Sequence, residues 1–139
     1  MNSIIVFESG GRIIRHGIYC EQADPSKGEM QIDGSAINIS DQYVDEVGRC
    51  VVDMPLRPSM AHDFDYATKQ WVRNVDEAWR LVRQRRDNLL SACDWTQLPD
   101  VPTATQELWR TYRQELRDIT QQSDPFAIVW PAQKALLKT

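Results

Sequence analysis

Short apolar runs separated by turn residues fill the first half of the chain. Residues 4–7 form a β-branched and aromatic run that stops at a glycine pair, and apolar positions return between residues 12 and 20. Further on, Met30 and Ile32 alternate with polar neighbours, as strand residues do when one face is buried. The Pro, Ser and Gly residues of segment 23–28 predict a loop between these runs.

The alternation continues beyond a turn predicted at Asp33 and Gly34. Because the connections are too short for helical crossovers, the strands are predicted to form an antiparallel meander. Its later apolar positions are Ile37, Ile39 and the runs at residues 43–44 and 50–52.

A last hairpin is predicted before the pattern changes. Pro55 and Pro58 impose an extended, non-helical passage. Residues 64–66 and 70–72 are then expected to pair across the residues between them. The pattern contains no recognisable internal repeat and no low-complexity segment.

Helical periodicity begins at Asn74. Asn74 with Glu77 three residues later is a capping arrangement, and Thr103 with Gln106 repeats it at the start of a second helix. Two amphipathic helices joined by a connector of about ten residues predict an αα-hairpin. The apolar stripe of the first helix is Val75, Trp79, Val82, Arg86, Leu89 and Cys93, and that of the second is Leu108, Trp109, Tyr112, Leu116 and Ile119.

The tail is expected to be extended. Prolines at both ends of residues 124–131 exclude a helix, and the apolar run between them is expected to lie along the helical pair. Residues 132–139 are expected either to add a last helical turn or to fray. The predicted class is therefore α+β, with an N-terminal β-rich module at residues 1–73 and a C-terminal helical hairpin with an extended tail at residues 74–139.

Composition narrows the classes of function. The 139 residues carry a net charge of −4, so bulk electrostatics do not favour a polyanionic partner. The N-terminus has no basic segment before its short apolar run, which indicates neither a signal peptide nor a membrane span. We therefore expect a protein of the cytoplasm without a membrane partner, whose cysteines are buried and unpaired: Cys20, Cys50 and Cys93.

Catalytic and metal-binding patterns are absent from the sequence. The two histidines, His16 and His62, lie in no recognisable nucleophile or metalloprotease motif. His62, Asp63 and Asp65 form a small polar cluster, but nothing else has the ligand spacing of a metal site. The expectation is a protein that is not an enzyme and holds no metal and no cofactor.

The basic run of the first helix is the one feature that suggests nucleic acid. Arg80, Arg83, Arg85 and Arg86 lie close together, but Asp76 and Asp87 stand four residues from Arg80 and Arg83. Such i,i+4 pairs neutralise a helix face. A solvated face laced with ion pairs is favoured, and no nucleic-acid partner is expected.

The connector between the helices predicts a rigid corner. Asp94 and Thr96 are expected to bond nearby backbone amides, and Pro99 and Pro102 fix φ. Trp95 is expected to bury its ring across both helices.

The same residues carry a resemblance to a known family. The segments RDNLL (86–90), CDWTQLPDVP (93–102), WRTYRQELRDI (109–119) and WP (130–131) resemble, in order and spacing, the phage tail assembly chaperone domain. The likeness spans about residues 73–131. It departs from the family at Thr103 and Ala104, where the family places a hydrophobic residue and then Thr.

The resemblance implies a phage tail or tail-fibre assembly protein. Such a protein would bind a tail-fibre or other tail protein in the host cytoplasm, without catalysis, and would cover an apolar surface until assembly buries it. The alternatives are a structural virion component of the baseplate or fibre attachment, retained in the virion tail, and a nucleic-acid-binding regulator. Self-association into a homo-oligomer is left open.

Candidate partner-binding residues follow from the resemblance and from the helical pattern. Trp79, Trp109 and Tyr112 lie on apolar stripes and are assigned to the core. The residues proposed to contact a partner are Trp95, Gln97, Asp100, Arg113, Arg117 and Trp130.

Overall fold

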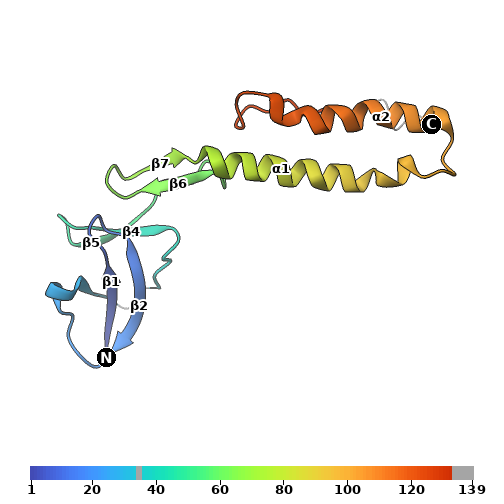
Figure 1. Ribbon diagram of the computed structural model, residues 1–139. Helices are drawn as coiled ribbons and strands as arrows, with labels where there is room; N and C mark the ends of the chain where they lie inside the picture. Colours follow the sequence, from blue (N-terminus) through green and yellow to red (C-terminus); the bar gives the residue numbers. More distant parts are fainter. Residues whose placement is uncertain (34–35, 133–139) are drawn as a thin grey trace. The chain divides into compact units, whose positions relative to one another are not determined.

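The computed structural model describes residues 1–33 and 36–132. The chain forms two compact units, Met1–Val72 and Arg73–Thr139, and each is described by itself (Figure 1). Antiparallel strands make up the first unit and two α-helices dominate the second, so the α+β class is confirmed. Gly34 of the predicted turn and residues 133–139 of the predicted last turn lie outside the described residues. Within the described ranges, no helix is both long and apolar enough to cross a membrane.

The first sheet has three antiparallel strands in the order β2-β1-β3. Strand β1 (Asn2–Phe7) is central and pairs with β2 (Ile13–Tyr19) on one side and β3 (Glu29–Ile32) on the other. The loop predicted at residues 23–28 contains the short 3-10 helix η1 (Pro25–Lys27) and carries the chain across to the free edge of β1. This crossing brings Met30 next to Ile5 in the core.

The β4–β5 hairpin packs on the turn between β1 and β2. Strands β4 (Gln42–Asp45) and β5 (Cys50–Asp53) pair in the predicted place. The Val44 amide donates to the carbonyl of Gly11 at 2.8 Å, so the turn and the hairpin share a backbone hydrogen bond. The core of the unit is Ile5, Ile13, Met30 and Val44, with Phe7, Ile32, Ile37 and Val51 packed against it.

The β6–β7 hairpin repeats the β4–β5 hairpin, although no repeat was predicted from the sequence. Strands β6 (His62–Asp65) and β7 (Gln70–Arg73) form a two-stranded sheet. In both hairpins an Asp at the end of the first strand accepts a hydrogen bond from a turn amide, Asp45 from Val47 and Asp65 from Ala67. A cation with positive φ precedes the second strand in each, Arg49 and Lys69. The two hairpins share the geometry of their turns but not the same apolar residues. The hydrophobic pattern therefore gave no sign of the repeat.

Aromatic rings join the two hairpins. Phe64 lies at the centre, with its ring 5.5 Å from that of Tyr43, 5.0 Å from that of Tyr66 and 5.3 Å from that of Trp71. Lys69 donates from Nζ to the carbonyl of Gly10, which ties the second hairpin to the β1–β2 turn. The first unit is therefore built as successive layers of β-structure held by side chains.

Two expectations about the first unit are wrong. Ile37 and Ile39 lie outside any strand, because Asn38 accepts from the Ser40 amide and folds this segment into a turn. Cys20 and Cys50 are exposed, and only Cys93 is buried. Both exposed cysteines lie at strand ends, where a small side chain has little to pack against.

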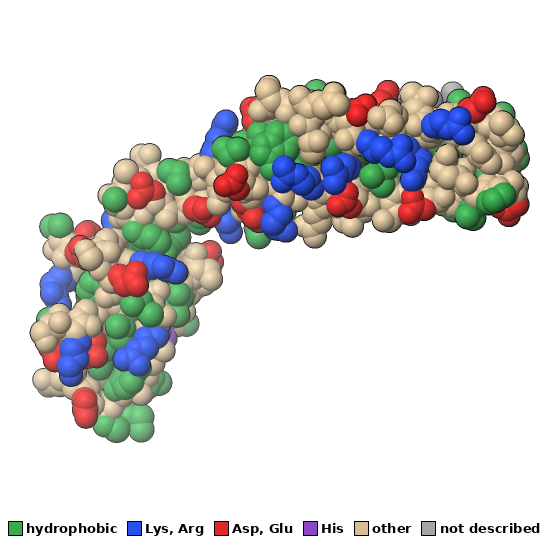
Figure 2. Space-filling view, viewed as in Figure 1, with side chains coloured by type: hydrophobic (Ala, Val, Ile, Leu, Met, Phe, Trp, Pro, Cys, Tyr) green, Lys and Arg blue, Asp and Glu red, His purple; other side chains and the backbone are tan. Residues whose placement is uncertain are grey.

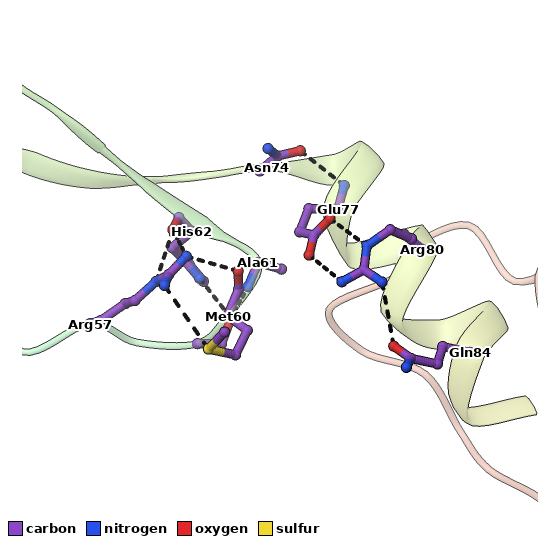
Figure 3. Close-up of polar contacts among 9 residues, drawn as sticks. Arg57, Met60, Ala61, His62, Asn74, Glu77, Arg80 and Gln84 are labelled. Atoms are coloured by element: carbon purple, nitrogen blue, oxygen red, sulfur yellow. Dashed lines mark hydrogen bonds and ion pairs between the residues drawn. The ribbon is translucent and has the colours of Figure 1, made fainter. Parts of the chain in front are cut away.

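Helix α1 (Val75–Ala92) begins at its predicted cap. The Asn74 side chain accepts a hydrogen bond from the Glu77 amide at 2.9 Å, and Glu77 in turn binds Arg80 (Figure 3). Val82 is buried and Trp79 is half-buried on the predicted stripe, but Val75 is exposed because it belongs to the first turn. Ala78, outside the predicted stripe, is buried instead.

Helix α2 (Thr103–Arg117) starts without the predicted side-chain cap. Pro102 is the N-cap residue and supplies the carbonyl that accepts from the Gln106 amide. Thr103 is the first helical residue, so its hydroxyl does not cap the helix, and that expectation is wrong. Pro102 fits the cap position because its fixed φ and extended ψ lead directly into the helix.

The two helices pack through a small apolar cluster. Cys93, Tyr112 and Leu116 are buried, and Ile119 is buried in the 3-10 turn η3 (Asp118–Gln121) after α2. Leu108 was predicted on this face but is half-exposed on the flank of α2. The residues packed around the cluster are Leu89, Leu90, Trp109 and Trp130, so the tail contacts the helical pair as expected. The expectation that it is extended is wrong, because the Ala127 amide donates to the Asp124 carbonyl and forms a turn.

Candidate partner-binding surface

The connector folds as a short 3-10 helix, η2 (Asp94–Gln97), on a buried threonine. Thr96 is fully buried, and its hydroxyl donates to the carbonyl of Cys93 at 2.6 Å. The sequence predicted a bond to a backbone amide. The Thr96 hydroxyl bonds a carbonyl instead because Cys93 is the C-cap residue of α1, and the last carbonyl groups of a helix lack helical partners. Thr96 therefore fixes the direction in which the chain leaves the helix.

Arg113 closes the corner from α2. Its guanidinium donates to the carbonyl of Leu90 at 2.9 Å and to Cys93 Sγ at 3.1 Å, and pairs with Asp94 at 2.8 Å. Burial acts to lower the pKa of Arg113, but its hydrogen bonds with Asp94 and Cys93 outweigh burial, so the pKa lies above its ordinary value. Arg113 stays charged and joins the end of α1 to the middle of α2.

Two glutamines cross-link the connector to the start of α2. Gln97 Nε2 donates to the carbonyl of Gln106 at 3.3 Å and to Thr96 Oγ1 at 3.1 Å. Gln106 Nε2 donates to the carbonyls of Leu98 and Val101 at 3.0 and 2.9 Å. Sequence reasoning missed the role of Gln106, because its spacing from Thr103 suggested a cap. The connector carbonyls thus have partners, and the corner is rigid.

Three aromatic rings form a row from solvent into the core. The Trp95 ring lies 5.9 Å from that of Trp109, which lies 5.7 Å from that of Tyr112, both edge to face. Of the two possibilities for the Trp95 ring, burial across both helices and contact with a partner, its exposure of 53% excludes the first. Tyr112 is buried, which raises the pKa of its phenol, and Cys93 adds to the effect. Trp109, assigned to the core from its periodicity, is only half-buried.

The outer end of this row is an exposed apolar area on a rigid base. Leu98 follows η2 and is 51% exposed. We call Trp95, Leu98 and Trp109 the corner patch. An apolar patch whose backbone is held by Thr96 and Gln97 loses little entropy when it binds, so it suits contact with another protein.

The proposed contact residues occupy three different places. Trp95, Gln97 and Arg113 come together at the corner, with exposed Asp100 in the same connector, but Gln97 and Arg113 are used inside it. Arg117 is exposed at the far end of α2. Trp130 lies on the tail, half-buried beneath the guanidinium of Arg85 at 4.4 Å.

The arginines of α1 are accompanied by acids, as predicted, but with different partners. Arg80 pairs with Glu77 at 2.6 Å and not with Asp76, and this pair raises the pKa of Arg80. Arg86 pairs with Asp87 at 2.8 Å. Figure 2 shows a row of Lys and Arg side chains along one face of the second unit, with Asp and Glu side chains beside it.

The hydrogen bonds around His62 are made within its own loop. Ser59 Oγ lies 2.8 Å from His62 Nδ1, and Arg57 donates to the carbonyls of His62 and Met60 (Figure 3). Among residues 1–33 and 36–132, no group of three or more His, Cys, Asp or Glu side chains is placed to hold a metal ion.

Comparison with known proteins finds one family model that matches the corner. Residues 79–134 match the family model described as phage tail assembly chaperone protein. This match supports a phage tail assembly chaperone domain in this part of the chain. The match runs from α1 through the connector and α2 into the tail, so the corner patch lies within the chaperone domain. No curated protein and no solved structure matches the chain.

The match supports a role in phage tail assembly. The corner's hydrogen bonds lie inside the matched range, whereas the β-rich first unit lies outside it.

Proposed function

We propose that the protein is a chaperone-like binding protein, without catalytic activity, that acts on a phage tail-fibre or other tail protein. The observation that carries this proposal is the corner patch, an exposed Trp95 and Leu98 on a hydrogen-bonded base inside the tail assembly chaperone domain. A large ring with few rotatable bonds gives much contact area at a small entropic cost.

The proposed mechanism is temporary cover of an apolar surface. An unassembled tail protein exposes apolar area that its own partners later bury, and such area drives aggregation. The corner patch would lie against that area in the host cytoplasm and would leave when assembly buries it. Trp95 is expected to contribute most, because Trp is enriched among the residues that dominate binding energy.

Coexpression with a tail-fibre gene from the genome that encodes this protein tests the proposal. The fibre alone should aggregate, and coexpression should give soluble fibre that copurifies with the protein. The double variant Trp95→Ser and Leu98→Ser should lose both effects. Val47→Ser is the matched control, since Val47 is 96% exposed in the turn between β4 and β5 and outside the matched domain.

The alternative outcomes separate the remaining possibilities. A stable complex of fixed ratio that persists in purified virions, with fibre that folds alone, would favour a structural component of the baseplate or fibre attachment over a chaperone. Soluble trimeric fibre made without the protein, together with no complex by size exclusion, would rule out both roles.

A further inference from the structure

The tail that follows η3 packs on the helices in the manner of a bound peptide. We call residues 122–132 the strap. The Arg73 guanidinium lies 4.8 Å from the Phe126 ring and the Arg85 guanidinium 4.4 Å from the Trp130 ring. Trp130 also packs against the buried cluster of Cys93, Tyr112 and Leu116. Two aromatic side chains thus hold the strap, Phe126 against Arg73 at the end of β7 and Trp130 against the helical pair.

The strap has a shape of its own. The Gln122 side chain accepts from the Val129 amide and donates to the Val129 carbonyl, both at 2.9 Å. Asp124 accepts from the amides of Phe126 and Ala127, through its side chain and its carbonyl. These bonds close a loop inside the strap and do not tie it to the helices.

The helical cluster against which Trp130 packs is more deeply buried than the strap itself. Leu116 and Cys93 are fully buried, whereas Phe126, Ile128 and Trp130 are half-buried and Val129 is 76% exposed. Release of the strap would therefore expose apolar surface on α1 and α2. The cations left uncovered would be the Arg73 guanidinium at the end of β7 and the Arg85 guanidinium on α1, and both suit aromatic rings.

We infer that the face of α1 and α2 beneath the strap is a peptide-binding site, occupied by the strap in the free protein, for an aromatic segment of a tail protein. The segment would carry a Trp followed by Pro, because Trp fills the place of Trp130 and Pro keeps the chain extended. Only the origin of the segment rests on the proposed function; the binding site itself does not.

A peptide supplied in trans tests this site without any tail protein. The probe is a fluorescent peptide with the sequence of residues 122–132, QSDPFAIVWPA, and the acceptor is the full-length Trp130→Ala variant. The peptide should bind this variant at least tenfold more tightly than it binds the wild type, whose own strap competes, and should raise the variant's melting temperature. No binding to the variant would overturn the inference.

Altered peptides test which side chain is recognised. A peptide with Ala in place of Trp should bind at least tenfold more weakly, whereas a peptide with Ala in place of Val129 should bind as the parent does, because that side chain is exposed. Equal affinity of all three peptides would show nonspecific binding and would overturn the inference.

A second variant keeps the test informative if Trp130→Ala does not fold. Gln122→Ala removes the closing bonds of the strap and leaves every contact on the helices in place. It should bind the peptide several-fold more tightly than the wild type. Affinity equal to that of the wild type would count against an exchangeable strap. A failed coexpression experiment would leave this result standing, so the two proposals fail separately.

Discussion

The Arg113 guanidinium binds the Asp94 carboxylate across the corner, with Nη2 and Oδ1 2.8 Å apart. The pair is unequal, because the Arg113 side chain is 11% exposed and that of Asp94 is 65% exposed. The buried partner also binds the Leu90 carbonyl near the end of α1, while the exposed partner adds only its charge. The cation therefore matters more to the corner than the ion pair does.

Replacement of Arg113 should destabilise the fold far more than replacement of Asp94. Arg113→Met removes the buried hydrogen bonds of the guanidinium to the Leu90 carbonyl and to Cys93 Sγ, and we expect a loss of about 2–4 kcal/mol in the free energy of unfolding. Asp94→Asn should cost about 1 kcal/mol or less, because exposed ion pairs contribute little. Urea denaturation of both variants measures the difference. Equal losses would show that the ion pair, and not the carbonyl contact, holds the corner.

Replacement of Trp95 should destabilise the protein less than replacement of Trp109, although the two rings are in contact. Trp95→Ala should cost about 1–2 kcal/mol, because half of its surface is already in water, and Trp109→Ala about 2–4 kcal/mol, because it packs on the cluster. Thermal and urea unfolding give both values. A larger loss for Trp95→Ala than for Trp109→Ala would contradict the exposed position of Trp95 and the corner patch with it.

Gly11 and Gly10 should respond unequally to the same added methyl group. Both have positive φ, 89° and 91°, which costs an alanine about 1–2 kcal/mol. At Gly11 an added Cβ would lie 2.0 Å from the Val44 carbonyl oxygen, whereas at Gly10 the nearest atom is 3.5 Å away. Gly11→Ala should therefore unfold or loosen the β4–β5 hairpin, and Gly10→Ala should keep it. Amide protection of Val44 by hydrogen exchange distinguishes the two variants.

Asp65 should contribute to the acid sensitivity of the first unit. The Ala67 amide and the Thr68 side chain hydrogen-bond its carboxylate, which lowers the pKa of Asp65 below its ordinary value. A lowered folded-state pKa stabilises the fold above the unfolded pKa of about 3.9, and that stability is lost as pH falls through the folded pKa. Asp65→Asn should flatten the decline in stability below about pH 4. Unfolding curves of variant and wild type that stay parallel there would exclude this contribution.

The helical hairpin could be predicted from local signals. Asn74 caps α1 because a short polar side chain reaches an unpaired amide within one turn, which is information carried by neighbouring residues. The stripe through Val82 and Leu116 follows from the period of the helix, and the prolines of the tail exclude a helix without reference to anything distant. The family resemblance also rested on residues in order along the chain, and the family match confirms it.

The wrong predictions concern side chains whose partners lie far away in the sequence, or that compete with another residue for the same position. Pro102, and not Thr103, is the N-cap residue of α2, and the Gln106 side chain donates to the connector carbonyls. Trp95 has an apolar ring and a position suited to burial, yet Trp109 already fills the space beside Tyr112. Periodicity states which face of a helix is apolar, but it does not state how much of that face the partner helix can cover.

The sequence by itself determined the two helices, the hairpins and the family of the second unit, because caps, turn residues and apolar periods act over a few neighbouring residues. Only the tertiary structure decided that Arg113 and Gln97 hold the corner, that Trp95 and Leu98 face solvent, and that the tail lies as a strap over the helices. Those outcomes depend on which of several side chains occupies a given buried position. That competition is settled by packing between segments far apart in the chain.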